Sequence, residues 1–300
     1  MTVVLVTGAT GRIGTRLVPA LTNAGYTVRR GTRSPREHGD VLTDFEDDAS
    51  LQTALAGVDT VVHLASNPRA LRQRSDAWLT ERLLTARAAA APQSELLMLS
   101  IVGCDRTPMP YYRAKARAET MVRGAGGQIV RSTQFHGFLT RLLSPLPVLR
   151  RPVLPAGWSV QPVDEHFVVE VLLAAVHEPG SAPAEVAGPE QLTVAEAARR
   201  LGHQPWRVSV PGGLSRAIRS GSLLAQQGHL TFTPSGSLAG IGRAHVEDVV
   251  GLVAAVGHRR RQFQVHCTAG KQARAAERLQ NPQLRHDVLA GMRRGKVRPE

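Results

Sequence analysis

Two patterns of hydrophobic and polar residues alternate along the first 200 positions. Short, mostly apolar runs occur at residues 3–6, 59–64 and 95–101, as expected for strands buried on both faces of a parallel sheet. Longer segments with helical spacing follow, such as residues 73–91, which Pro92 ends. Strands that alternate with helices of this length predict βαβ crossovers, and therefore an α/β chain with a parallel sheet.

The same patterns predict further elements. Strands are expected at residues 26–32, 40–44, 128–132, 159–163, 186–188 and 207–210, and helices that begin near residues 13, 50, 111, 164, 193, 214 and 246. Asp164 and the pair Thr193 and Glu196 have the spacing of N-terminal helix caps. We therefore interpret Asp164-Glu165-His166 as a capping segment on a solvated face rather than as a catalytic relay.

Three glycines follow the first strand, with the spacing Gly8-x-x-Gly11-x-x-Gly14. Gly8 allows a tight turn, Gly11 lets a pyrophosphate approach the backbone, and Gly14 lets the next helix pack close to the strand. The pyrophosphate would lie at the helix N-terminus, on free N–H groups and at the positive end of the helix dipole. This order of strand, glycine turn and helix predicts dinucleotide binding by a doubly wound parallel sheet of the Rossmann type.

The end of the second strand bears on the choice of cofactor. An NAD enzyme usually places a carboxylate here, for the ribose hydroxyls, whereas this sequence has Thr32 and Arg33. An arginine would pair with a 2′-phosphate through a bidentate contact. We therefore expect NADP(H) to be preferred over NAD(H), with Arg30 and Arg36 as secondary candidates.

The segment from Thr7 to Gly14 resembles the cofactor loop of the short-chain dehydrogenase/reductase superfamily, most closely its extended and atypical branches, which include NmrA-like NAD(P)-binding proteins. The resemblance implies that Asp44 lies against the adenine, although Asp40, Asp47 and Asp48 compete for this role. It also implies further contacts with the cofactor from the loop and from the backbone after the fourth strand: Ala9, Thr10, Arg12, Ile13, Leu64, Ala65 and Ser66.

Tyr111 and Lys115 lie four positions apart in a predicted helix and therefore share one face. A tyrosine has an ordinary pKa of about 10, and a nearby ammonium stabilises the phenolate. With Ser100 at the end of a strand, they resemble the Ser, Tyr-x-x-x-Lys triad of the same superfamily. The resemblance implies that Tyr111 donates a proton, Lys115 holds the ribose and Ser100 binds the substrate oxygen. Tyr112 is an alternative to Tyr111, with a poorer spacing.

A second resemblance follows the sixth strand. Gln134 and Phe135 stand in a segment that resembles the Arg-x-x-Gln-Phe sequence of the atypical branch, which borders the substrate cavity. This implies a substrate pocket that includes Gln134, Phe135 and His136, although His136 could instead make a structural hydrogen bond at a helix start. We expect His63, inside a strand, to be a core residue. No cluster of ligand residues has the spacing of a metal site.

Charge and cysteine content change this interpretation little. The net charge is +13, but residues 258–300 hold eleven Lys/Arg and three Asp/Glu, which accounts for +8 of it. Nearly all basic residues are arginine, so we do not expect specific nucleic-acid binding. With two cysteines, no apolar run long enough to span a bilayer and no signal peptide, we expect a cytoplasmic protein without disulfides or membrane contact.

We expect three regions: an NAD(P)-binding Rossmann domain at 1–155, a smaller substrate-side region at 156–230, and a basic, weakly patterned extension at 231–300. The predicted function is that of an NADP(H)-dependent oxidoreductase that acts on a small carbonyl, alcohol or quinone-like substrate. The alternative is a non-catalytic NmrA-like redox sensor that binds a protein partner, and sugar-nucleotide epimerase or dehydratase activity ranks third. We expect a monomer or a homodimer.

Overall fold

The structure is a computed structural model of residues 1–300, of which it describes residues 1–70, 73–143, 152–182, 184–200, 202–208, 216–217, 221–225 and 230–231. These residues all belong to one compact unit, Met1–Val249. The helix predicted at 246–256, most of the one predicted at 214–219 and nearly all of the predicted extension lie outside the described residues. The proposed region boundaries stay predictions.

A parallel sheet forms the centre of the described fold, with the strand order β12-β9-β6-β5-β4-β1-β2-β3. Six of these strands follow the order 3-2-1-4-5-6, which is that of the Rossmann fold. The predicted doubly wound parallel sheet is therefore confirmed. Its strands are β1 (Val3–Thr7), β2 (Thr27–Thr32), β3 (Asp40–Leu42), β4 (Thr60–His63), β5 (Glu95–Ile101), β6 (Gln128–Ser132), β9 (Glu185–Ala187) and β12 (Leu230–Thr231).

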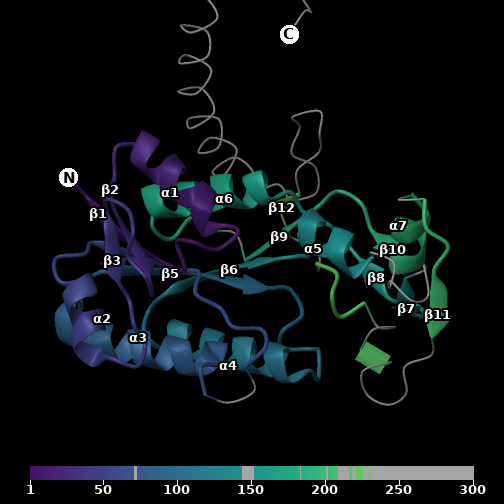
Figure 1. Cartoon of the computed structure of the whole chain (residues 1–300), viewed down its shortest axis with the longest axis horizontal. Helices are drawn as coiled ribbons and strands as arrows, with labels where there is room; N and C mark the ends of the chain where they lie inside the picture. The colour runs from purple at the N-terminus through teal and green to yellow at the C-terminus, as the bar shows by residue number, and fades with distance from the viewer. Residues whose placement is uncertain are drawn as a thin grey trace, which may run out of the picture. The chain divides into compact units, whose positions relative to one another are not determined.

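Helices cover both faces of this sheet (Figure 1). One face carries α1 (Gly14–Asn23) and α6 (Glu165–His177), and the other carries α2 (Asp48–Leu55), α3 (Asp76–Ala90) and α4 (Pro110–Gly124). Leu5, Val61 and Met98 of the sheet belong to one buried cluster with Leu83 of α3 and Val122 of α4. Because the sheet is packed on both sides, its ligands must bind beyond the carboxyl ends of the strands.

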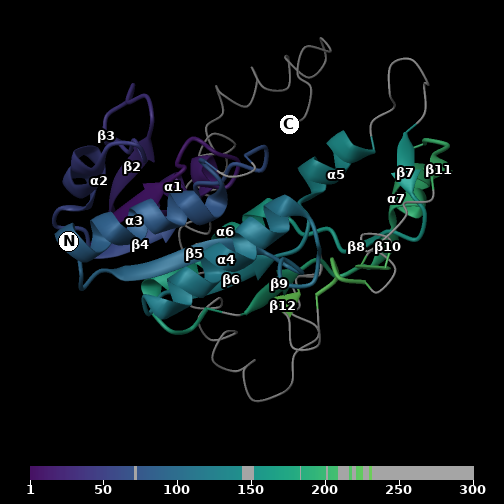
Figure 2. The same cartoon turned by 90° about the horizontal axis from the view of Figure 1, so that it is seen from below.

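A second group of elements lies beyond α5 (His136–Leu142), at one end of the sheet (Figure 2). It consists of two small sheets, β8 (Ser159–Val160) with β10 (Leu192–Thr193) and β7 (Val153–Pro155) with β11 (Trp206–Val208), and of helix α7 (Val194–Arg200). A separate small core, which includes Leu139 of α5, Leu154 and Val194, holds this group together.

Local capping explains where the helices begin. Helix α2 starts at Asp48, two residues before the predicted position, because the Asp47 carboxylate accepts hydrogen bonds from Ala49 N and Ser50 N at 3.1 and 3.2 Å. Helix α3 starts at Asp76 rather than residue 73, after the N-cap Ser75. The predicted cap of α6 is confirmed, since Asp164 Oδ1 accepts a hydrogen bond from His166 N at 2.6 Å.

Candidate functional site

The glycine loop after β1 has the close contacts that its sequence predicts. Gly8 has a φ of +68°, and a Cβ on it would lie 2.9 Å from Ala65 N. A Cβ on Gly14 would lie 2.5 Å from Gly8 O and 2.6 Å from Ala9 O. No other residue fits at Gly14 without moving the loop, so the first turn of α1 packs directly against the end of β1.

The N-terminus of α1 differs from those of α2, α3 and α6 because no side chain caps it and its first turn contains no acidic residue. Within the described part of the chain, the N–H groups of Ile13 and Gly14 have no hydrogen-bond acceptor. Free amides at the positive end of a helix dipole suit an anion such as a pyrophosphate. These residues therefore fit a dinucleotide, and they would hold its phosphates.

A cavity of about 560 Å³ lies on one side of this loop. Its lining includes the predicted cofactor residues Thr10, Thr32, Arg33, Asp44 and Ala65. Arg33 is exposed, and no carboxylate in the described ranges forms an ion pair with it. The residues predicted to contact the adenosine half of a dinucleotide thus line one cavity, which stays a candidate for that half.

The three other acidic candidates for the contact with the adenine have structural roles. Asp40 accepts hydrogen bonds from the backbone of residues 36 and 37 and pairs with Arg30, and these bonds, together with that charge, hold its pKa below the ordinary value. Asp47 caps α2, and Asp48 pairs with Arg82 at 2.5 Å. Among the four, Asp44 is the one whose residue lines the cavity.

A second cavity, of about 740 Å³, lies on the other side of the loop. Ser100, Tyr111 and Lys115 all line it, together with Gly14, Arg12 and Phe135. The two cavities share four lining residues, Gly8, Gly11, Leu64 and Ser66, so they adjoin at the carboxyl end of β1. The structure thus brings the predicted triad and the glycine loop to one place.

Lys115 reaches this cavity from a buried ion pair that the sequence did not indicate. Its Nζ lies 3.0 Å from Asp76 Oδ2 and donates a hydrogen bond to Leu99 O at 3.2 Å. The side chains of Lys115 and Asp76 are 5% and 0% exposed. Burial lowers the pKa of Lys115, but the charge of Asp76 and the neighbouring Tyr111 outweigh it, so the pKa lies above its ordinary value. Two of the three ammonium protons are used, and one is left for a ligand.

The tyrosine hydroxyl contacts a serine other than the predicted one. Tyr111 Oη lies 3.2 Å from Ser66 Oγ, and Ser66 Oγ donates a hydrogen bond to Asp76 Oδ2 at 2.7 Å. Ser100 is 1% exposed and makes no hydrogen bond to Tyr111 within the described residues, and its hydroxyl interacts with the Glu119 carboxylate and helps to lower the pKa of that residue. Tyr112 packs edge-on against Tyr111, with 5.8 Å between the ring centroids. It does not line the cavity, and burial raises its pKa.

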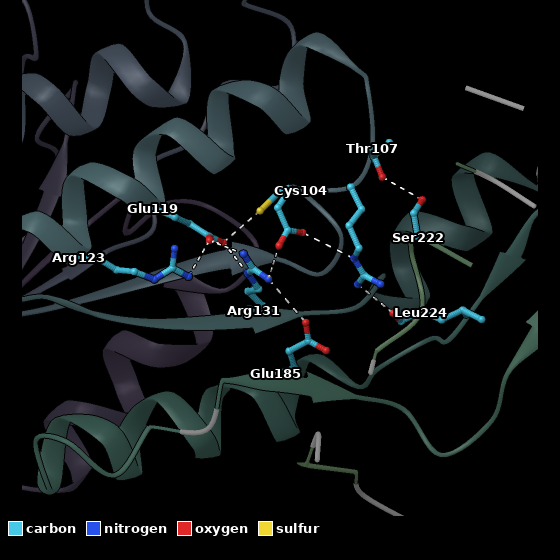
Figure 3. A network of polar contacts seen from close by, with 10 residues as sticks. Cys104, Thr107, Glu119, Arg123, Arg131, Glu185, Ser222 and Leu224 are labelled. Carbon is cyan, nitrogen blue, oxygen red and sulfur yellow. Dashed lines mark hydrogen bonds and ion pairs between the residues drawn. The ribbon is translucent and has the colours of Figure 1, made fainter. Parts of the chain in front are cut away.

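A polar network fixes the loop between β5 and the start of α4 (Figure 3). Arg131 donates to the buried Glu119 at 2.6 and 2.9 Å and to Asp105 at 3.2 Å. Burial raises the pKa of Glu119, but the hydrogen bonds from Arg131 outweigh it and hold the pKa below its ordinary value. Thr107 Oγ1 also lies 3.0 Å from Ser222 Oγ. The network therefore anchors the helix that carries Tyr111.

His63 has the core role expected for it. It is 1% exposed, and its Nδ1 and Nε2 lie 2.8 and 3.2 Å from the hydroxyls of Thr7 and Thr80. Thr80 already donates to Asp76 O at 2.8 Å, so it must accept from Nε2–H, and Thr7 must donate to Nδ1. Burial lowers the pKa of His63 to about 3, and the imidazole is neutral.

The three predicted substrate residues are consecutive in the chain, but their side chains have different surroundings. Phe135 lines the cavity with Tyr111, whereas His136 lines a different cavity of about 530 Å³ on the other side of α5. Gln134 donates to Leu223 O at 3.0 Å and accepts from Gln161 N at 3.1 Å, so its amide joins two segments of the fold. The roles of Gln134 and His136 in a substrate pocket stay predictions.

Arg12, predicted to contact the cofactor, extends its side chain across Gly137 to Glu165, with its guanidinium 2.9 Å from the carboxylate. Arg16 pairs with the same carboxylate at 3.1 Å. What Arg12 offers to a phosphate in this structure is its backbone N–H. The pair also gives Glu165 a structural role, in agreement with its interpretation as part of a capping segment.

Together, the sheet order, the uncapped helix and the two adjoining cavities define an α/β domain of the Rossmann type with a candidate dinucleotide site. The comparisons with known proteins agree. A family described as NAD(P)H-binding matches residues 8–130. A fatty acid hydroxylase, uhd1, of Mycosarcoma maydis is 33% identical over 114 residues, which cover 32% of this chain and 38% of that protein. The match thus spans just over a third of that relative.

Solved structures share the fold over most of their length. A short-chain dehydrogenase/reductase superfamily protein from Agrobacterium tumefaciens with bound NAD has a TM-score of 0.57 at 18% identity and covers 89% of this chain and 99% of its own. A nucleoside-diphosphate-sugar epimerase from Staphylococcus aureus has a TM-score of 0.58 at 17% identity (75% and 92%). Triphenylmethane reductase from Citrobacter, complexed with NADP(H), has a TM-score of 0.57 at 13% identity (75% and 92%). Residues 8–130 are therefore similar to an NAD(P)H-binding family, and the chain shares its fold with these dehydrogenase, reductase and epimerase structures.

None of the helices in the described residues is long and apolar enough to cross a membrane. These residues also contain no group of three or more His, Cys, Asp or Glu side chains placed to hold a metal ion.

Proposed function

We propose that the protein is an NADP(H)-dependent oxidoreductase that acts on a small carbonyl, alcohol or quinone-like substrate. One observation carries the proposal: Ser100, Tyr111 and Lys115 line a single cavity that adjoins the uncapped N-terminus of α1. A proton donor, a cation and a hydroxyl group beside a dinucleotide loop are the groups that carbonyl reduction needs. Neither an epimerase nor a dehydratase has a comparable specific observation in its favour.

The cofactor, when bound, would supply the hydride. Gly8, Gly11 and Gly14, with the backbone of Ile13, would hold its pyrophosphate. Tyr111 would donate its hydroxyl proton to the substrate oxygen. The remaining N–H of Lys115 would hold the ribose.

Ser100 would orient the substrate, and its place in the lining of the same cavity as Tyr111 and Lys115 supports this role.

Arg33 would select NADP(H) by pairing with the 2′-phosphate. It is exposed, lines the cavity on the adenosine side and follows a strand that ends in Thr32 instead of a carboxylate. The one arginine that shares this cavity, Arg74, is already paired with Glu46 at 2.6 Å. Arg33 thus offers the charge that is available to a phosphate.

The cavity beside Tyr111 suits a small substrate with an apolar body. Phe135, Phe138 and Leu142 line one part of it, and Leu99 and Ile101 line another. Phe138 is 48% exposed, which is unusual for a phenylalanine and consistent with a role in covering a ligand. We propose that residues 156–230 complete this substrate side and that the protein acts in the cytoplasm.

The test is a panel of aldehydes, ketones and quinones with NADPH, repeated with Tyr111→Phe and Lys115→Ala. We expect turnover by the wild type and a loss of about 10²- to 10⁴-fold in kcat for Tyr111→Phe. Turnover by Tyr111→Phe at the wild-type rate would reject the assigned proton donor.

The cofactor assignment has its own pair of variants. Arg33→Ala should weaken NADPH binding roughly tenfold, as loss of a charged hydrogen bond does, and leave NADH binding unchanged. Arg36→Ala changes a secondary candidate in the same exposed loop that does not line the cavity, and it should leave the binding of both nucleotides unchanged. Equal effects of Arg33→Ala on both nucleotides would exclude it as the selector.

A second candidate is a non-catalytic NmrA-like redox sensor, and the Asp76–Lys115 pair favours it. A carboxylate 3.0 Å from the ammonium cancels the charge that would otherwise stabilise a tyrosine phenolate. Submicromolar NADPH binding without turnover of any compound in the panel would support the sensor over the enzyme.

A further inference from the structure

A continuous chain of hydrogen bonds links the tyrosine of the proposed site to the buried ion pair. Tyr111 Oη lies 3.2 Å from Ser66 Oγ, Ser66 Oγ lies 2.7 Å from Asp76 Oδ2, and the same Oδ2 lies 3.0 Å from Lys115 Nζ. Asn67 N donates to the other carboxylate oxygen at 2.7 Å. Asp76 is fully buried, whereas Ser66 is exposed to solvent.

The donors and acceptors in this chain can be assigned. A carboxylate paired with an ammonium only accepts hydrogen bonds, so Ser66 must donate its single proton to Asp76. The oxygen of Ser66 then has lone pairs only for Tyr111, so Tyr111 donates to Ser66. Asp76 thus fixes the direction of both hydroxyl groups. This arrangement joins a side chain in the cavity to one that is in contact with water.

We infer that Ser66, oriented by the buried carboxylate of Asp76, is the proton relay that reprotonates Tyr111 from solvent. The inference rests on the proposed oxidoreductase function, and it adds a residue that the predicted triad does not contain. Ser66 is catalytic in this scheme because it contacts the reacting hydroxyl. Asp76 is a positioning residue that acts through Ser66 and Lys115.

The relay transfers protons in one concerted step, in which each O–H bond that breaks is replaced by one that forms. After Tyr111 has given its proton to the substrate oxygen, the O–H bond of Ser66 turns from Asp76 to the phenolate and breaks as a new O–H bond forms on Tyr111. A hydronium ion or a water molecule on the exposed side of Ser66 supplies the replacement proton. One proton moves from solvent to the substrate oxygen, and Asp76 stays ionised throughout.

Ser66 is better placed for this role than Ser100. Ser100 is buried, and no hydrogen bond among the described residues joins its hydroxyl to Tyr111, whereas Ser66 is exposed and lies 3.2 Å from Tyr111 Oη. The two serines therefore have different tasks, with Ser100 on the substrate oxygen and Ser66 on the proton supply. This division predicts different kinetic effects.

The experiment compares Ser66→Ala, Ser66→Thr and Ser100→Ala in steady-state reduction of an active carbonyl from the panel by NADPH. Ser66→Ala should lower kcat about 10- to 100-fold, the lower range for general acid–base catalysis, with KM and the Kd for NADPH changed less than about threefold. It should also raise the solvent deuterium isotope effect on kcat, because proton delivery becomes slower. Ser66→Thr, which keeps the hydroxyl, should restore most of the rate, whereas Ser100→Ala should raise KM.

Two further variants and a binding measurement distinguish a slower relay from a general loss of structure. Ser181→Ala removes an exposed hydroxyl far from the cavity in sequence and should leave every parameter unchanged. Asp76→Asn removes the charge at nearly constant size, and it should lower kcat and raise the isotope effect. Unchanged NADPH binding in each variant shows that it is folded.

Failure of the relay and failure of the proposed function give different results. If the wild type turns over substrate and Ser66→Ala keeps kcat within twofold with an unchanged isotope effect, the relay is wrong and the oxidoreductase stands. If the wild type binds NADPH and reduces no compound in the panel, the proposed function is wrong and the relay is rejected with it.

Discussion

Replacing Asp76 by alanine should be among the most destabilising single changes in the described fold. The carboxylate accepts from Lys115 at 3.0 Å, from Ser66 at 2.7 Å and from Asn67 N at 2.7 Å, and it is fully buried. Its removal leaves the Lys115 ammonium, only 5% exposed, without a counter-charge. Breaking a buried ion pair in this way costs about 3–5 kcal/mol. For a unit of this size, that loss lowers Tm by about 6–20 °C.

The double variant Asp76→Leu with Lys115→Met tests whether the cost of Asp76→Ala comes from the unpaired charge of Lys115. Because both charges are then absent, the desolvation penalty is also absent, and such replacements range from neutral to stabilising in other proteins. We expect the double variant to recover most of the stability that Asp76→Ala loses, within about 2 kcal/mol of the wild type. The effects of Asp76→Leu and Lys115→Met made singly would then be strongly non-additive, as expected for residues in contact.

Urea unfolding at pH 7.5, followed by circular dichroism, measures these differences in the absence of nucleotide. The matched control is Glu190→Gln, which breaks an ion pair with Arg200 whose side chains are about half exposed, 54% and 50%. That change should cost less than about 1 kcal/mol. A cost below about 1 kcal/mol for Asp76→Ala, or a double variant no more stable than Asp76→Ala, would refute the argument, because the ammonium would then be reaching water.

Three further predictions concern other parts of the described fold. The native pKa of His63, about 3, lies below its unfolded value of about 6.5, so the unfolded chain binds more protons between these values and stability falls as pH decreases through this window. About 2 kcal/mol should be lost by pH 5, and His63→Gln should have a flatter profile in urea melts at pH 5–8; an equally steep profile would contradict the assignment. Gly14→Ala should weaken NADPH binding at least about tenfold in a fluorescence titration, because its Cβ would lie 2.5 Å from a backbone oxygen. The control Gly124→Ala should bind NADPH normally, because its Cβ would meet nothing within 4 Å. Burial, and after it the charge of a neighbouring carboxylate, raises the pKa of Cys104 to about 12. In a Cys267→Ser background, the Cys104 thiol should therefore react with a disulfide reagent at pH 8 only when the protein unfolds, and a rapid reaction of the native protein would contradict this.

The sequence specified the sheet and the glycine loop well because both depend on local signals. The run from Val3 to Val6 can only be a buried strand, and the strands at 95–101 and 128–132 have the bounds that their apolar patterns predict. Gly14 is required by a contact within six residues of it, which a sequence motif can encode. The spacing of Tyr111 and Lys115 likewise placed both on one face of α4, and both line the same cavity.

The sequence did not indicate Asp76 or the side-chain role of Ser66. An acidic residue in the first turn of a helix has an ordinary explanation in the helix dipole, so Ser75-Asp76 is typical of a capped N-terminus and nothing more. Its pairing with Lys115 joins residues 39 positions apart through the packing of α3 on α4, which no local pattern reports. The signal that was available is that Ser66 and Asp76 follow β4 and Lys115 follows β5, and that these are neighbouring parallel strands whose carboxyl ends lie at one edge of the sheet.

The buried pair also determines how the proposed site can work. Because Asp76 neutralises Lys115, the pair adds hydrogen bonds but no net charge to the middle of the cleft. Arg12 is likewise paired, with Glu165. In the described ranges, Arg33 in one cavity and Arg69 in the other are exposed arginines without an ion-pair partner. Attraction for an anionic nucleotide therefore arises at the two ends of the cleft. The proposed proton transfer at its centre would rely on oriented hydroxyl groups, because Lys115, which shares a helix face with Tyr111, is compensated by Asp76.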